Sequence, residues 1–141
     1  VLNQAYMSCE DKDVLREREQ NEKNLFSVLE QYPVPADCNG ADKNMWALMV
    51  REVLALEDRI QRGCEVTKWQ NAQFKLMHGL LGFSLRDHLT DEESAEIREA
   101  GVLLNKQGGT AEMIQTLTVW VPRSLRRYVE YQWDGIGNWC A

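Results

Sequence analysis

An aromatic-rich stretch at 119–139, VWVPRSLRRYVEYQWDGIGNW, sets the strongest limits on how this chain can fold. Five of the chain's twelve aromatic residues fall within it: Trp120, Tyr128, Tyr131, Trp133 and Trp139. Each ring can bury a large apolar area, so a cluster of this kind either closes a small core or forms a contact surface for a partner. Since aromatic residues are common in both settings, we expect core packing first and an exposed partner surface second.

The pattern within this stretch predicts a helix with defined ends. Pro122 suits the first helical position, where its missing N–H would have no partner within the helix. Glycine adopts the left-handed conformation that ends a helix, so Gly135 and Gly137 should stop it. Apolar residues at helical spacing between these ends predict one buried face, made by Leu125, Tyr128, Val129 and Trp133.

The first turns of this predicted helix carry Arg123, Arg126 and Arg127. A helix N-terminus already has a positive dipole end, so cations there are unfavourable and an anion is expected nearby. The anion could be a carboxylate of this chain, an acidic partner or a phosphate. We favour a carboxylate of this chain, because it has 22 acidic residues and 16 basic ones.

The remaining pattern also predicts helices. Two capping boxes, Thr67 with Gln70 and Thr90 with Glu93, mark helix starts. Glycines at Gly63 and at Gly108-Gly109 mark helix ends. The expected helices span 10–31, 43–62, 67–88 and 90–106, followed by a short helix from Thr110 and the C-terminal helix. Asp42 is the expected cap of the second helix. For the third helix, the alternative is a break near Gly82.

We therefore predict an all-α fold, a compact bundle of five to six helices around a central apolar helix that includes 76–85. The whole chain, 1–141, is expected to form a single helical domain with 1–8 as a loose N-terminal lead-in. Gly79 and Gly82 lie three residues apart on the central helix and should let another helix approach closely.

Charge and hydropathy exclude several classes of function. The net charge of −6 argues against non-specific binding to nucleic acid or to an anionic membrane surface. Most of the excess acid lies in the first half: 1–65 has 13 acidic and 8 basic residues, and 66–141 has 9 and 8. No apolar run reaches the ~20 residues of a transmembrane helix, so we expect no membrane span.

The four cysteines, Cys9, Cys38, Cys64 and Cys140, do not show the spacing of zinc or redox motifs. Their low density favours free thiols, and with them a cytoplasmic location over secretion. The alternative is a pair of disulfides in an exported protein.

No catalytic, metal or cofactor signature is present, and we do not expect an enzyme. On one continuous helix, His78 and His88 would lie about 15 Å apart, too far to share a metal ion. A surface histidine beside a helix cap is the favoured interpretation of His88.

By elimination, we predict a protein–protein interaction module or an accessory subunit of a larger assembly. Its partner would be another protein, and a homo-oligomer is compatible with the sequence. The predicted partner-binding residues are Arg123, Arg126, Arg127, Tyr131, Trp133 and Trp139, since arginine and large aromatics dominate binding energy at interfaces. The alternative is a secreted, disulfide-linked helical effector or small-ligand carrier.

Overall fold

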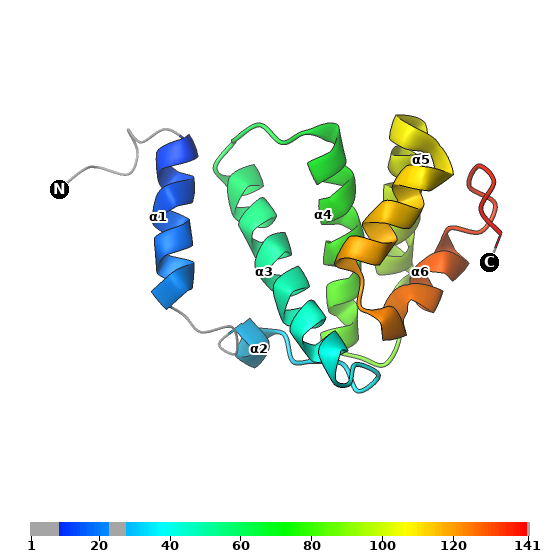
Figure 1. Cartoon of the computed structure of the whole chain (residues 1–141), viewed down its shortest axis with the longest axis horizontal. Coiled ribbons are helices and arrows are strands. Elements are labelled where there is room, and N and C mark those ends of the chain that lie inside the picture. The colour runs from blue at the N-terminus through cyan, green and yellow to red at the C-terminus, as the bar shows by residue number, and fades with distance from the viewer. Residues whose placement is uncertain (1–8, 23–27, 141) are drawn as a thin grey trace.

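The computed structural model describes residues 9–22 and 28–140, and this part of the chain contains helices and no strand. Figure 1 shows the arrangement. The elements are α1 (Cys9–Glu22), α2 (Val28–Gln31), α3 (Ala41–Gln61), α4 (Lys68–Leu80), the 3-10 turn η3 (Leu81–Ser84), α5 (Asp91–Trp120), the 3-10 turn η4 (Arg123–Leu125) and α6 (Arg126–Gln132). The predicted all-α fold is confirmed.

Helix α4 is the centre of the bundle, as its apolar sequence predicts. Figure 1 shows it between α3 and α5, and both helices pack against it. Its buried residues join those of α3, α5 and α6 in one hydrophobic core. Within the described ranges, no helix combines the length and the apolar character that a bilayer crossing requires.

Three of the helix ends that local signals predict are found in the structure. Thr67 and Thr90 each form a complete capping box, with Gln70 and Glu93 respectively, at the starts of α4 and α5. Gly63 follows α3 with φ +75°, the left-handed conformation expected there.

Two elements differ from the expected bounds. The helix expected to continue to His88 ends at Leu80 and tightens into η3, so the alternative break near Gly82 is correct. Helix α5 runs from Asp91 to Trp120, but Gly109 has non-helical φ and ψ of 69° and −162°. The chain bends there, where Gly108-Gly109 was expected to separate two helices.

Close packing of α4 and η3 against α5 explains the glycines at this junction. A Cβ atom at Gly79 would lie 2.7 Å from Ile97 Cγ1, far inside van der Waals contact. At Gly82, a Cβ atom would collide with the Glu93 carboxylate, which also accepts a hydrogen bond from the Thr90 N–H. The predicted close approach is confirmed for both glycines.

The structure describes only part of the N-terminal region. The helix expected over 10–31 appears as α1 and α2, and 23–27 between them lie outside the described residues, as does the expected lead-in, 1–8. Figure 1 shows α1 at the edge of the bundle beside α3, on the side away from α5 and α6.

The expectation of four free thiols is wrong. Cys9 at the start of α1 forms a disulfide with Cys64, just after α3, while Cys38 and Cys140 remain free. Fifty-five positions separate the bonded cysteines, so no local motif marks the pair, and only the docking of α1 beside the end of α3 brings them together.

Candidate functional site: the C-terminal helix

Helix α6 and the preceding turn η4 present two opposite rows of side chains. Leu125, Val129 and Trp133 recur every four residues and are fully buried. Arg123, Arg127 and Tyr131 recur at the same interval, two residues out of step, and all are exposed. Two residues correspond to about 200° around a helix, so the second row faces solvent. We call Arg123, Arg127 and Tyr131 the outer row.

Trp133 was predicted both on the buried face of this helix and as a partner contact, and the structure places it in the core. Its side chain is 0% exposed and its indole N–H donates to the Ile97 carbonyl oxygen at 2.8 Å. A Cβ atom at Gly101 would lie 2.5 Å from the ring, so this glycine makes room for the indole. Trp139 is only partly buried and packs edge-on against Trp133, with ring centroids 5.3 Å apart.

Arg126, also predicted as a partner contact, forms hydrogen bonds with the C-terminal end of α5 instead. Its Nε donates to the Val121 carbonyl oxygen at 3.1 Å, and its Nη2 donates to that of Thr118 at 3.0 Å. The last carbonyls of a helix have no partner within the helix and carry the negative end of the dipole. Arg126 therefore caps α5, which explains a cation in the first turn of α6.

The anion expected at this positive helix end is Asp42. Its carboxylate accepts hydrogen bonds from the backbone N–H of Arg123 at 3.1 Å and of Ser124 at 3.0 Å, and from the Ser124 hydroxyl. The Ser124 hydroxyl, then the two N–H groups and the charge of Arg126, hold the pKa of Asp42 below its ordinary value. The anion is thus a carboxylate of this chain, as favoured from the sequence.

Asp42 was expected to cap its own helix, and that expectation is wrong. The residue before α3 is Gly40, which provides no side-chain cap, and Asp42 lies one position inside the helix. The Asp42 carboxylate joins the start of α3 to the start of η4 across more than eighty positions of sequence.

Arg98 of α5 holds the other end of α6, and no local sequence signal indicates this role. Its Nη1 donates to the carbonyl oxygens of Gln132 at 2.7 Å and Asp134 at 3.0 Å. A cation is favourable at the C-terminal end of a helix, where the carbonyls point outward. Asp42 and Arg98 thus fix the two ends of α6 and determine the direction of the outer row.

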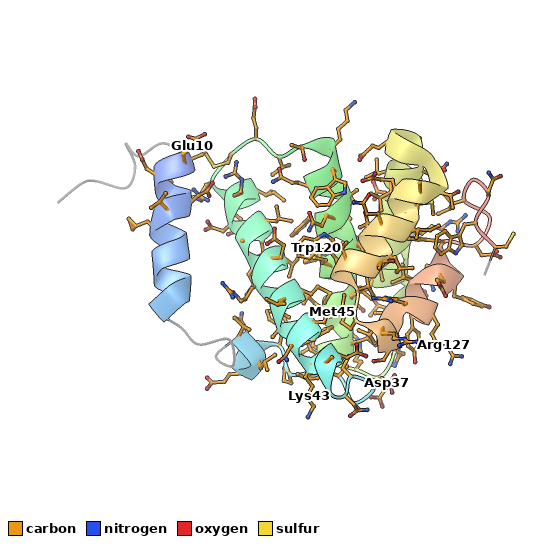
Figure 2. The ribbon with its side chains drawn as sticks, in the orientation of Figure 1. Glu10, Asp37, Lys43, Met45, Trp120 and Arg127 are labelled. Atoms are coloured by element: carbon orange, nitrogen blue, oxygen red, sulfur yellow. A yellow bond between two sulfur atoms is a disulfide. The ribbon has the colours of Figure 1, made fainter. Side chains whose placement is uncertain are left out.

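The outer row is the part of the predicted contact set that reaches solvent. Tyr131 is 75% exposed, the highest fraction among the large hydrophobic side chains described. Figure 2 shows the Arg127 side chain at the margin of the bundle, directed away from α6. Next to this row, Tyr128 contacts the Phe83 ring and its hydroxyl donates to Asp37 at 3.3 Å.

The other side chains that could act as nucleophiles or metal ligands either take part in packing and hydrogen bonds or lie far from one another. Burial raises the pKa of the Cys38 thiol to about 11, so it is protonated near neutral pH and a poor nucleophile. His78 Nδ1 lies 2.6 Å from Glu96 Oε1, and His88 is exposed beyond η3. Among the described residues, no three histidine, cysteine or acidic side chains gather as metal ligands.

These contacts divide the six predicted residues into two groups of three. Arg123, Arg127 and Tyr131 form an exposed row, whereas Arg126, Trp133 and Trp139 serve the packing of α5 and α6. Comparison with protein-family models, curated proteins and solved structures finds no match to this chain, so its function must be argued from this row.

Proposed function

We propose that this protein is an interaction module that binds an acidic surface of another protein through the outer row of α6. The observation that carries the proposal is the exposure of Tyr131 between fixed helix ends, with two arginines at four-residue spacing beside it. Tyrosine and arginine are enriched among the residues that contribute most to binding at interfaces.

Charge complementarity supports the choice of an acidic partner. Neither Arg123 nor Arg127 forms an ion pair within the described ranges, 9–22 and 28–140, whereas Arg59, Arg62 and Arg86 each pair with a carboxylate. The planar guanidinium can bind a carboxylate through two parallel hydrogen bonds. A partner that presents acidic side chains would satisfy both arginines and cover the ring of Tyr131.

Rigidity of the site also favours binding. Asp42 and Arg98 hold the two ends of α6, and Leu125, Val129 and Trp133 anchor its inner row in the core. A surface that is already ordered before binding loses little conformational entropy when the partner docks. The helix backbone that carries the outer row is held in this way.

The test is the affinity of a partner identified by co-purification from the source organism, measured by calorimetry with purified components. We expect Arg127→Glu and Tyr131→Ala each to weaken binding by about 30-fold, which corresponds to ~2 kcal/mol for a residue central to an interface. The melting temperature should stay within about 2 °C of the wild type, because both side chains are exposed.

The matched control is Lys68→Glu with Lys106→Glu, which reverses charges on exposed residues of α4 and α5. These substitutions should leave the affinity unchanged at physiological salt. Equal affinity for the wild type and the outer-row variants would contradict the proposal. If only a second copy of this chain bound and the outer-row variants abolished that association, the partner would be the protein itself and the acidic-partner proposal would fail.

The rival prediction, an exported helical effector or carrier, gains one supporting observation. Cys9 and Cys64 form a disulfide, and disulfides persist in oxidising compartments. We therefore propose that the module works outside the reducing cytoplasm. Thiol titration of the denatured native protein should find two reactive thiols, Cys38 and Cys140. Four thiols would show that the disulfide is absent in the native protein and would remove this support.

A further inference from the structure

Helix α1 is attached to the molecule in a different way from the other long helices. None of its side chains at 9–15 belongs to the hydrophobic core, and Val14 is 59% exposed. The core is instead built from α3, α4, α5 and α6 and the segments between them. Hydrophobic burial, which dominates the docking of most helices, therefore contributes little over this part of α1.

Among the side chains of α1 that the structure describes, 9–15, two kinds of contact with the end of α3 stand out. The first is the covalent bond between Cys9 and Cys64. The second is a charged cluster in which Asp13 pairs with Arg59 and, at 2.7 Å, with Arg62. Arg62 also donates to the Cys9 carbonyl oxygen at 3.4 Å. All of these contacts lie at one end of α1, near Glu10 in Figure 2.

We propose that α1 is a strap released by reduction of the Cys9–Cys64 disulfide, while the bundle from α3 to α6 keeps its fold. Ion pairs at partly exposed sites contribute little on their own, and the Asp13 side chain is 36% exposed. A helix as short as α1, with 14 residues, is marginal in water once it is detached. Without the covalent bond, α1 separates from α3 and loses its helical structure.

The chemistry of release is thiol–disulfide exchange with a dithiol reductant. A thiolate of the reductant attacks the Cys9 sulfur, because Cys9 is partly exposed and Cys64 is only 8% exposed. The Cys9–Cys64 bond breaks, a mixed disulfide forms at Cys9, and the Cys64 thiolate leaves and takes up a proton. The second thiol of the reductant then resolves the mixed disulfide, so the reductant becomes a disulfide and Cys9 a thiol.

Release would change the surface at the end of α3. Asp13 leaves Arg59 and Arg62, which adds positive charge to the exposed surface there. Asp58, four residues before Arg62 and 2.8 Å from its Nε, remains in place. Oxidised and reduced forms would thus present different charges on the side of the molecule away from α6.

Hydrogen exchange on the full chain, oxidised and after treatment with dithiothreitol, tests the proposal. We expect peptides from α1 to lose their amide protection on reduction, and peptides from α4 and α5 to keep theirs. Continued protection of α1 after reduction would overturn the proposal, because other contacts would then hold it. Loss of protection throughout α4 and α5 would overturn it as well, since the disulfide would then support the whole fold.

The matched variant is Cys9→Ser with Cys64→Ser. It should show an unprotected α1 without any reductant, and dithiothreitol should change nothing further, because Cys38 and Cys140 form no disulfide. A response of this variant to dithiothreitol would assign the effect to another cysteine and contradict the proposal. If the variant does not fold, the reversible reduction of the wild type remains a complete test.

Discussion

At the scale of single residues, the neighbouring arginines Arg126 and Arg127 show how position decides role. The sequence places both in the first turn of the last helix and offers no local reason to separate them. In the structure, Arg126 caps the carbonyls of α5, whereas Arg127 points away from the bundle. One arginine serves stability and the other is free to serve binding.

Substitution of the two arginines by methionine should separate these roles. Methionine keeps an apolar side chain of similar length and removes the guanidinium. We expect Arg126→Met to lower the free energy of unfolding by about 1 kcal/mol, because two charge-assisted hydrogen bonds to helix carbonyls are lost. Arg127→Met should change it by less than ~0.5 kcal/mol. Urea denaturation measures both, and equal losses would show that both arginines serve the fold.

His78 contributes to the stability of the folded state in a way that depends on pH and can be measured. Its hydrogen bond with Glu96, assisted by the charges of Glu96, Glu57 and Glu93 and opposed by burial, raises its pKa above the ordinary value. The imidazolium stabilises the folded state fully below its unfolded pKa of about 6.5, and this stabilisation disappears as pH rises through the folded pKa.

Glu96→Gln tests this dependence, since it keeps the shape of the side chain and removes the charge. The wild type should exceed the variant in stability by a few tenths of a kcal/mol at pH 5.5, because the His78 side chain is 45% exposed and solvent screens the pair. By pH 8.5 the difference should shrink. Thermal melts of both proteins across this range check the trend, and a difference that grows with pH would refute the assignment.

At the scale of elements, the packing of α6 on α5 depends on the fit of Trp133 against Gly101. The ring is fully buried and donates to Ile97, and no space remains for a Cβ at Gly101. Because α6 has only seven residues, its own hydrogen bonds cannot maintain it without this contact.

Substitutions on the two sides of this contact should lower the free energy of unfolding by different amounts. Trp133→Ala should lower the free energy of unfolding by about 3–5 kcal/mol, through lost burial and the cavity that remains. Gly101→Ala should cost about 1–3 kcal/mol by overpacking, despite the higher helix propensity of alanine. Gly108→Ala is unsuitable as a control, because its Cβ would meet Glu112, so Ala95→Gly on the exposed surface of α5 is preferable. An Ala95→Gly loss as large as that of Trp133→Ala would contradict this account.

The element boundaries show what could be predicted from sequence. Capping boxes at Thr67 and Thr90 and the left-handed Gly63 are local signals, because the partners lie within a few residues. Contacts such as Asp42 with Ser124 join residues far apart in the chain, and no spacing rule identifies them. The predicted cap role of Asp42 was wrong for this reason: a local rule was applied to a side chain with a distant partner.

At the scale of the whole molecule, the fold consists of a packed centre and two peripheral features. Helix α4 and its neighbours form the core, α6 displays the outer row on one side, and α1 is attached by the disulfide on the other. The fold class followed from hydrophobic periodicity, which a bundle core requires. Helical spacing also placed Trp133 on the buried face of the aromatic stretch and left Tyr131 off it, as the structure has them. It placed Tyr128 on the buried face as well, and that was wrong, because Tyr128 lies at the edge of the helix and is 36% exposed.

Hydroxyl-radical footprinting of the protein alone and in complex with its partner tests whether the outer row of α6 is the binding surface. We expect Tyr131 to become protected in the complex, whereas Ile114 and Leu48, exposed on α5 and α3, should keep their reactivity. Trp133 should be unreactive in both states. Protection of Ile114 or Leu48 with Tyr131 still reactive would place the binding surface elsewhere and contradict the assignment of α6.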